Sequence, residues 1–345
     1  MLVLGIESSC DETAVALVRA DRAILASHVA SQMATHARYG GVVPELAARD
    51  HVERLAPMVA AVLEEAGVAL AAVDAMAATA GPGLIGGVMV GLVSAKALAF
   101  ATGKPLYAVN HLEGHALSPR LAEHGLRFPY LLLLVSGGHC QLLRVHGPGR
   151  HARLATTIDD AAGEAFDKGA KLMGLGFPGG PAIERLAREG DPAAVPLPRP
   201  LVGSDEPHFS FAGLKSALAR LVAGPAPPPA PDLAASLQAA IVDCLVDRTR
   251  RALDAAGPVT ALVAAGGVAA NGAVRAALGA LAAARGLPFH APLGWLCTDN
   301  AAMIAWAAIE RAQAGLPPDG LDAPARARWP LDPGAEPVRG AGVRA

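Results

Sequence analysis

The stretch LVLGIESSCDETAVALV, residues 2–18, decides the fold class of this chain. An apolar run, Leu2–Ile6, enters a small polar turn, and a second apolar run follows over Thr13–Val18. This pattern predicts a strand, a turn and a returning strand. The chain repeats the pattern later, as Tyr130–Val135, then SGGH, then Cys140–Val145. Two such units predict a duplicated α/β protein with two lobes and a cleft between them.

Further segments place the remaining elements. A third related piece consists of a strand over Ala261–Ala265, the turn GGVAANG and a helix over Ala273–Arg285. Apolar spacing elsewhere predicts helices at Pro44–Gly67 and Gly86–Ala101, and strands at Val73–Ala77 and Leu106–Val109. The segment GPAPPPAP, residues 224–231, is predicted to be a surface loop, because proline fits neither helix interiors nor central strands. We therefore expect one lobe from residues 1–108 plus about 298–333, a second from 109–297, and a flexible tail over 334–345.

Length and composition limit the class of protein. The chain has 345 residues, and single cores usually stop growing near ~250–300 residues, so two lobes are expected. The net charge is −2, so a nucleic-acid contact would need a local basic patch, such as Arg248, Arg250 and Arg251 in DRTRR, or a partner. Four cysteines lie far apart and are typical of reduced thiols in the cytoplasm. The apolar stretch 84–100 is shorter than the ~20 residues of a membrane span, so we expect a buried helix and no membrane association.

The stretch HLEGH, residues 111–115, raises the question of a metal site. If Asn110 caps a helix, His111 and His115 lie one turn apart on the same face, where two imidazoles can bind one metal. A polar helix face that binds nothing fits the spacing about as well. In H-E-x-x-H peptidases the glutamate follows the first histidine directly, whereas Glu113 comes two positions later, roughly 200° round the helix. The motif therefore lacks the peptidase base.

Several loops carry residues suited to nucleotide contact. The glycines of SGGH, residues 136–139, let backbone amides approach an anion, although an ordinary hairpin turn is the commoner use. Asp167, in a glycine-rich segment with two lysines, could bind ribose hydroxyls or lie on a solvated helix face. Asp299 lies near the start of a late helix, in CTDNAAMIAWA. Capping that helix is its default role, and providing a carboxylate ligand is the alternative.

Taken together and in order, nine motifs resemble the TsaD family of bacterial tRNA adenosine threonylcarbamoyltransferases, formerly classed as O-sialoglycoprotein endopeptidases. The resemblance covers residues 2–333. The motifs are GIESSCDETAVA, GVVPELAARDHVE, TAGPGL, NHLEGHAL, LLVSGGH, DDAAGEAFDKGAKLMGLGFPGGP, FSFAGLKSA, AAGGVAANGAVR and LCTDNAAMIAW.

The resemblance implies an actin/sugar-kinase/Hsp70-like fold with a central nucleotide cleft. It implies transfer of the threonylcarbamoyl group from threonylcarbamoyl-AMP to the exocyclic amine of adenosine 37 in tRNAs reading ANN codons. It further implies one divalent metal ion, Fe²⁺ or Zn²⁺, a TsaB-like paralogue and a TsaE-like ATPase as partners. The metal ligands fall on His111, His115 and Asp299, and the substrate contacts on Leu134, Val135, Ser136, Gly137, Gly138, Asp167, Gly180 and Asn271.

Archaeal and eukaryotic relatives carry a tyrosine ligand where this chain has Leu134, which leaves a coordination position for water or substrate. The donor is an activated mixed anhydride, so the enzyme must orient the reactants, stabilise charge and remove a proton. Asp11 and Glu12 are the candidates for proton removal, or else they hold a phosphate-side metal or water. Two rival classes are a small-molecule kinase of the same fold, which would need no HxxxH motif, and a scaffold that binds nucleotide without catalysis.

Overall fold

The computed structural model describes residues 1–37, 39, 41–292 and 294–338 of the chain. By internal contacts the chain divides into a first unit, Met1–Gly125 with Thr298–Leu331, and a second unit, Leu126–Cys297 with Asp332–Ala345. The sequence suggested that the second lobe begins at residue 109. Residues 109–125 instead belong to the first unit, because the helix that they form packs against the late helix of that unit. The expected flexible tail lies outside the described residues from position 339 onward.

The first unit is built on a five-stranded sheet in the order β3-β2-β1-β4-β5. Its strands are β1 (Leu2–Glu7), β2 (Glu12–Arg19), β3 (Ile24–Ser31), β4 (Ala75–Gly81) and β5 (Leu106–Asn110). The first three strands are antiparallel neighbours, and β4 and β5 add in parallel to β1. The helices are α1 (Met33–Ala37), α2 (Pro44–Glu65), η1 (Leu70–Ala72), α3 (Ile85–Thr102), α4 (His111–Ala122) and α11 (Ala301–Gln313).

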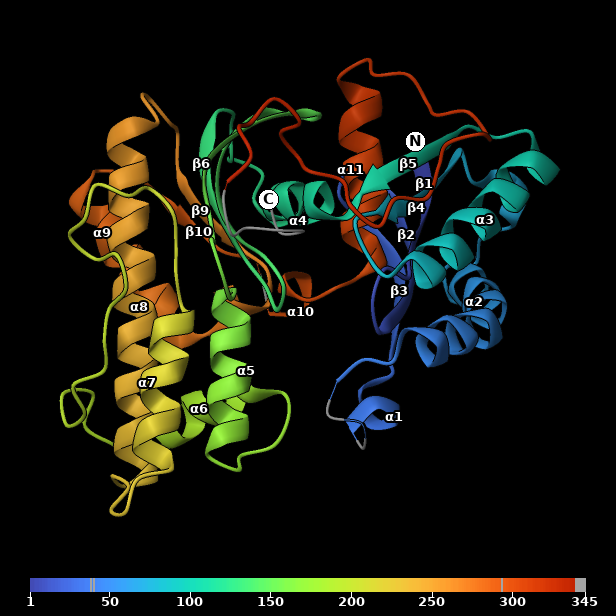
Figure 1. Ribbon diagram of the computed structural model, residues 1–345. Coiled ribbons are helices and arrows are strands. Elements are labelled where there is room, and N and C mark those ends of the chain that lie inside the picture. The colour runs from blue at the N-terminus through green and yellow to red at the C-terminus, as the bar shows by residue number, and fades with distance from the viewer. Residues whose placement is uncertain (38, 40, 293, 339–345) are drawn as a thin grey trace. The chain divides into compact units, whose positions relative to one another are not determined.

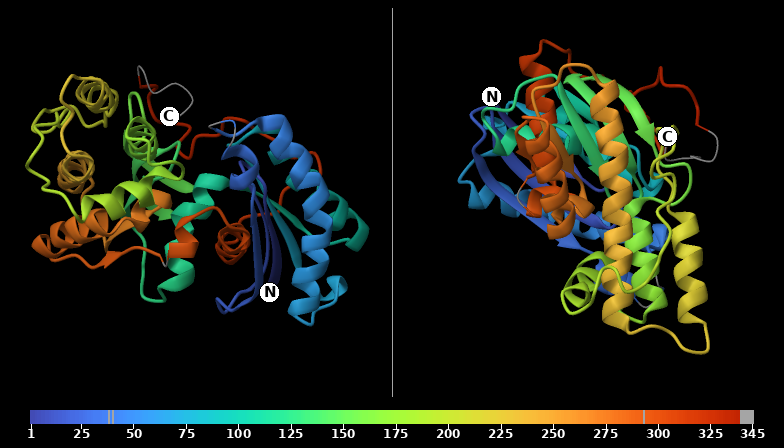
Figure 2. Two further views of the ribbon diagram at one scale, coloured as in Figure 1. Left: turned by 90° about the horizontal axis from the view of Figure 1, so that it is seen from below. Right: turned by 90° about the vertical axis from the view of Figure 1, so that its left-hand side faces the viewer.

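Helices cover both faces of this sheet. α2 and α3 lie on one face and α11 on the other (Figures 1 and 2). α11 approaches β1 closely: a Cβ at Gly5 would lie 2.4 Å from the carbonyl oxygen of Ala301. Only glycine therefore permits this contact between strand and helix. The contact fixes the start of α11, and with it the loop that carries Asp299, against the strand that ends at Glu7.

The second unit repeats the topology. Its sheet has the order β10-β9-β6-β7-β8, which is the order of the first sheet read in the other direction. The strands are β6 (Tyr130–Val135), β7 (Cys140–Gly147), β8 (Arg150–Thr156), β9 (Leu262–Ala265) and β10 (Phe289–His290). β6, β7 and β8 are antiparallel neighbours, and β9 and β10 are parallel to β6. The predicted duplication is therefore confirmed at the level of topology.

Helices of the second unit pack on its sheet around one hydrophobic core, to which β6 contributes Leu131, Leu133 and Val135. They are α5 (Ala162–Leu172), α6 (Gly179–Ala187), α7 (Ala212–Val222), α8 (Ala230–Ala255), η2 (Gly267–Ala270), α9 (Gly272–Ala284) and α10 (Gly294–Cys297). The predicted loop at 224–231 ends two residues early, because Ala230 and Pro231 form the first turn of α8, where proline is tolerated.

Two further expectations need correction. The strand predicted at 73–77 begins at Ala75 and runs on to Gly81, because it pairs with β1 and β5 over those residues. The helix expected to be buried, α3, has only 33% of its 18-residue apolar window buried, and by length and composition alone it could cross a membrane. Its large apolar side chains at Ile85, Met89, Val93 and Phe100 are exposed.

Candidate metal centre and active site

The HLEGH motif forms the first turns of α4, in the first unit. The Asn110 side-chain oxygen accepts a hydrogen bond from the Leu112 amide at 2.9 Å, so the predicted cap is confirmed. The Asn110 amide group in turn donates to the Trp329 carbonyl at 2.9 Å, which ties the cap to the last part of the unit. His111 and His115 therefore lie one helical turn apart, and their rings meet edge to face with centroids 4.8 Å apart.

Asp299 joins the two histidines and does not cap the late helix. The cap of α11 is Asn300, whose side-chain oxygen accepts from the Met303 amide at 2.9 Å. The default reading of Asp299 as a helix cap is therefore wrong. Its Oδ1 lies 3.0 Å from Nε2 of His115 and 3.5 Å from Nε2 of His111.

These three residues offer ligand atoms that all lie within 4.8 Å of one another. Ligands bound at about 2.0–2.1 Å in a tetrahedral site lie roughly 3.3 Å apart, so the arrangement needs little adjustment to hold a divalent ion. Two imidazole nitrogens and one carboxylate suit zinc or iron, and three protein ligands leave a position open. Glu113, the residue that a peptidase reading would need, does not belong to this cluster in the described part of the chain.

A buried carboxylate lies behind His111. Oε2 of Glu7 is 2.9 Å from Nδ1 of His111, and the Ser9 hydroxyl is 3.2 Å from the same nitrogen. Burial disfavours the imidazolium, but the charges of Glu7 and Asp299 outweigh it and raise the pKa of His111 to about 9. Sequence reasoning missed Glu7. The available signal was a single glutamate at the end of an otherwise apolar strand.

Asp11 and Glu12 lie on the loop between β1 and β2, also in the first unit. Burial raises the pKa of Glu12 to about 9, with further contributions from the charges of Asp299 and Asp11 and from a hydrogen bond to Asp11. Glu12 therefore retains a proton at neutral pH in the metal-free chain. Burial also raises the pKa of Cys10 in the same loop, so its thiol stays protonated. All four cysteines are free.

The residues expected to contact substrate all belong to the second unit. Ser136, Gly137 and Gly138 form the turn between β6 and β7, and a Cβ at either glycine would meet nothing within 4 Å. Leu134 and Val135 are fully buried in β6, so neither exposes its side chain to a ligand.

Of the three other expected substrate residues in this unit, Asp167 lies within α5, and Gly180 and Asn271 lie at helix starts. Asp167 accepts a hydrogen bond from the Gly179 amide at 2.8 Å and so supports the start of α6, where the neighbouring Gly180 has open space around it. Asn271 caps α9 by accepting from the Val274 amide at 3.1 Å, and it donates to Gln238 at 2.8 Å. Both side chains therefore already have protein partners.

Close backbone contacts bring these loops together. A Cβ at Gly163 would lie 2.4 Å from the Ser136 carbonyl oxygen, and one at Gly266 would lie 2.3 Å from that of Val135. The start of α5 and the turn after β9 therefore both pack on the end of β6. Gly266 also has φ 94°, in the region that favours glycine. The predicted glycine-rich loops thus form one surface within the second unit, at the carboxyl ends of the parallel strands β6 and β9.

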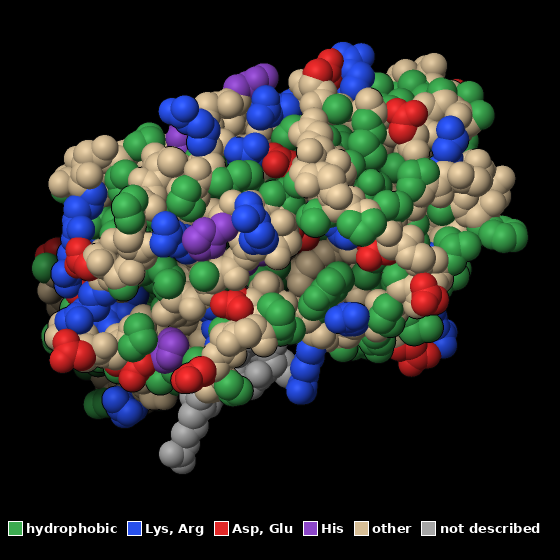
Figure 3. Space-filling view, turned by 90° about the horizontal axis from the view of Figure 1, so that it is seen from above, with side chains coloured by type: hydrophobic (Ala, Val, Ile, Leu, Met, Phe, Trp, Pro, Cys, Tyr) green, Lys and Arg blue, Asp and Glu red, His purple; other side chains and the backbone are tan. Residues whose placement is uncertain are grey.

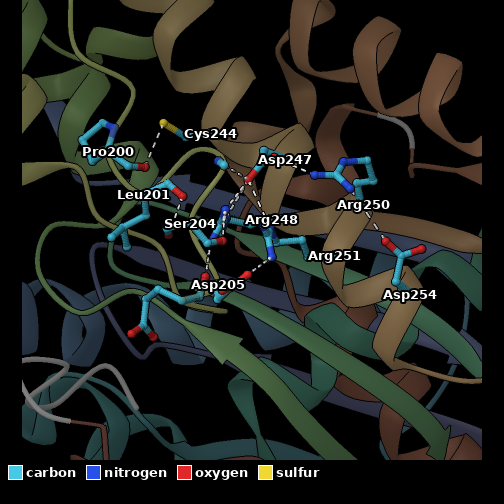
Figure 4. Close-up of polar contacts among 12 residues, drawn as sticks. Pro200, Leu201, Ser204, Asp205, Cys244, Asp247, Arg248, Arg250, Arg251 and Asp254 are labelled. Atoms are coloured by element: carbon cyan, nitrogen blue, oxygen red, sulfur yellow. Dashed lines mark hydrogen bonds and ion pairs between the residues drawn. The ribbon is translucent and has the colours of Figure 1, made fainter.

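The basic cluster DRTRR does not form a free basic patch. Arg248 is buried and pairs with Asp247, and Arg250 pairs with the same carboxylate at 2.9 Å (Figure 4). Arg251 lies 3.3 Å from Asp205. On the face shown in Figure 3, basic and acidic side chains are interspersed. Nearby carboxylates therefore partly neutralise these arginines.

Solved structures with a similar fold define the fold class of this chain. Two solved structures cover 91% of this chain: component A of (R)-2-hydroxyglutaryl-CoA dehydratase from Acidaminococcus fermentans (TM-score 0.53, 15% identity, 99% of that chain) and HypF from T. kodakarensis (TM-score 0.59, 14% identity, 48% of that chain). At these identities they show the fold alone, which is the actin/sugar-kinase/Hsp70-like fold implied by the sequence.

The family follows from the sequence comparisons. The family model described as "TsaD: tRNA N6-adenosine threonylcarbamoyltransferase" matches residues 23–306. A protein of that name from Sphingopyxis alaskensis is 72% identical over 100% of this chain and 99% of its own length, and one from Erythrobacter litoralis is 67% identical over the same shares. The chain belongs to the TsaD family.

Proposed function

We propose that this chain transfers the threonylcarbamoyl group of threonylcarbamoyl-AMP to N6 of adenosine 37 in tRNAs that read ANN codons. Membership of the TsaD family supports the transferase activity. The structural observation that carries the proposal is the convergence of His111, His115 and Asp299 in the first unit. A kinase of this fold would not need that arrangement, and the relatives compared above carry the transferase name.

The residues of the cluster would hold one divalent ion, Fe²⁺ or Zn²⁺, through Nε2 of both histidines and a carboxylate oxygen of Asp299. When bound there, such an ion would supply Lewis-acid chemistry, with which the site could hold the donor and polarise its carbonyl. Asp299 also provides the negative charge that a neutral imidazole pair lacks. Imidazoles bind metal in their neutral form, and nearby carboxylates raise the pKa of His111, so binding of the ion would displace a proton from this side chain.

Proton removal from the adenine amine is assigned to the Asp11–Glu12 pair. The two side chains share a hydrogen bond, and burial keeps the pKa of Glu12 raised to about 9. In the second unit, the backbone amides of Ser136, Gly137 and Gly138 are proposed to bind the donor phosphate. The remaining proposed donor contacts on this side are Leu134, Val135, Asp167, Gly180 and Asn271.

The decisive experiment is reconstitution. The chain is incubated with its partner proteins, threonine, bicarbonate, ATP and unmodified tRNA, and the tRNA is digested and analysed by mass spectrometry. We expect threonylcarbamoyladenosine to form, and Asp299→Asn to abolish it. ATP-dependent phosphorylation of a small molecule without modified nucleoside would indicate a kinase, and neither product would indicate a scaffold.

We further propose that the TsaB-like paralogue docks on α3. Ile85, Met89 and Val93 follow one another at four-residue spacing and are 46%, 51% and 56% exposed, and Phe100 is 79% exposed. The inward face of α3 carries small residues: a Cβ at Gly87 would lie 2.4 Å from the Ser8 carbonyl oxygen. The helix thus buries its small residues against β1 and leaves its bulky apolar residues outward, an arrangement typical of a protein interface.

Substitution in α3 tests this docking surface. Met89→Asp and Val93→Asp should abolish co-sedimentation with the paralogue, because each places a charge at the centre of the apolar surface. Val202→Asp introduces the same charge at an exposed apolar position of the second unit and is the matched control. Unchanged association of both α3 variants would show that the paralogue binds elsewhere. The complex is proposed to include a TsaE-like ATPase. Its proposed location is the cytoplasm.

A further inference from the structure

Glu7 is a buried carboxylate of the first unit that accepts hydrogen bonds from the loop after β1 and from β4. It is the last residue of β1, and it is 1% exposed. Its Oε1 accepts the Ser9 amide at 2.5 Å, and its Oε2 accepts the hydroxyl of Thr79 on β4. A buried carboxylate is costly unless it is paired and hydrogen-bonded. Its oxygens are thus committed, and Glu7 forms a fixed acceptor beneath the start of α4.

The fixed carboxylate determines how His111 presents its ring. Oε2 of Glu7 lies 2.9 Å from Nδ1 of His111, while Nε2 on the far side of the ring lies 3.5 Å from Oδ1 of Asp299. A carboxylate that accepts from Nδ1–H selects the tautomer whose lone pair is on Nε2, orients the ring and makes that nitrogen a stronger ligand.

His115 has no comparable support. Its Nδ1 is buried and has no hydrogen-bond partner among the described residues. Apart from the Asp299 oxygen 3.0 Å from its ligand-side Nε2, its ring is held by burial and by edge-to-face contact with His111. Within this pair, His111 alone therefore has a carboxylate at Nδ1, the nitrogen away from the ligand cluster, and His115 depends on His111 for part of its packing.

We propose that Glu7 is a positioning residue for the metal site, which holds His111 in the tautomer and orientation that bind the ion. This inference rests on the proposed function, in which His111 is a ligand. Glu7 touches neither donor nor acceptor in this role. It acts through the imidazole, with Thr79 and Ser9 keeping its carboxylate in place.

The test measures Zn²⁺ affinity of the full-length apo protein by competition with a chromophoric chelator, in Glu7→Gln and in wild type. We expect Glu7→Gln to weaken Zn²⁺ binding by roughly 10–100-fold, the usual cost of losing such a supporting group. Glu310→Gln is the matched control: Glu310 is also a buried carboxylate of the first unit, but it pairs with Arg120 at 2.7 Å and lies outside the ligand cluster. Its Zn²⁺ affinity should equal that of wild type.

A merely structural role for Glu7 would lower the melting temperature and leave the Zn²⁺ affinity of the folded protein unchanged, which would overturn the proposal. If Glu7→Gln does not fold, Zn²⁺ affinity is measured in Thr79→Val, which removes one hydrogen bond to Glu7. A Zn²⁺ affinity of Thr79→Val equal to that of wild type would then overturn the proposal. His115→Ala is measured alongside. Loss of Zn²⁺ in His115→Ala with wild-type affinity in Glu7→Gln would reject the positioning role alone, whereas full binding in both would reject the metal site itself.

Discussion

Asp299 and Asn300 are sequence neighbours with different roles, and single substitutions should separate them. Asn300 is fully buried; its Oδ1 accepts from the Met303 amide at 2.9 Å, and its Nδ2 donates to the Thr298 carbonyl at 2.8 Å. Asn300→Ala removes a helix cap and a second hydrogen bond, each worth about 1 kcal/mol. The expected loss is therefore about 2 kcal/mol of unfolding free energy.

For a unit of this size, 1 kcal/mol corresponds to about 2–4 °C in melting temperature, so Asn300→Ala should melt about 4–8 °C lower. It should still bind Zn²⁺, because the ligand cluster is intact. Asp299→Asn should behave in the opposite way. Its melting temperature should change little, since the cap of α11 is Asn300, while Zn²⁺ binding should weaken by more than the roughly 100-fold cost of losing a supporting residue.

The assay combines thermal unfolding of the apo proteins with Zn²⁺ titration by chelator competition. Asn300→Ser keeps a capping oxygen and is the control, which should recover part of the stability. The reasoning would be refuted by an Asp299→Asn protein that binds Zn²⁺ like wild type, and also by an Asn300→Ala protein that loses the metal without losing stability.

Three other outcomes follow from the structure. Gly5→Ala should lower the unfolding free energy by about 1–3 kcal/mol or more, because its Cβ would lie 2.4 Å from the Ala301 carbonyl oxygen; denaturant titration measures this, and wild-type stability would mean that α11 can move away. Burial lowers the pKa of His151 to about 4, against about 6.5 in an unfolded chain, so the unfolded state binds the extra proton between these values. Unfolding free energy should therefore fall by up to about 3 kcal/mol as the pH drops from 6.5 to 4. Urea titrations of His151→Leu should lack this pH-dependent loss of stability, and a pH dependence equal to that of wild type would contradict the prediction. Because the net charge is −2 and carboxylates neutralise the arginines at 248, 250 and 251, the isolated chain should bind tRNA weakly, and the complex with its partners more tightly and with a steep salt dependence. Equal affinity in filter binding would show that the basic surface is complete on this chain.

Local sequence patterns determined the elements and the helix that carries HLEGH. Tyr130–Val135 is a strand with the predicted bounds, and Asn110 caps α4 as expected. These features depend on neighbours a few residues away, so apolar spacing and capping residues contain the necessary information. The repeated strand–turn–strand pattern likewise predicted the duplicated topology.

Exposure and charge pairing were not available from local patterns. α3 is apolar all round, so spacing could not reveal that its bulky residues face outward while Gly87 faces the sheet. The arginines of DRTRR looked free in sequence, but Asp205, which pairs with Arg251, comes from a separate segment 46 residues earlier.

The site itself was decided by tertiary structure. Asp299 meets His115 across 184 residues of chain, and Glu7 meets His111 across 104. The sequence named Asn110, His111 and His115 as a unit because they share one helix, but it left Asp299 between a cap and a ligand and missed Glu7. Which distant carboxylate reaches an imidazole depends on strand order and on the close packing of α11 on Gly5, and neither is written in any short stretch of residues.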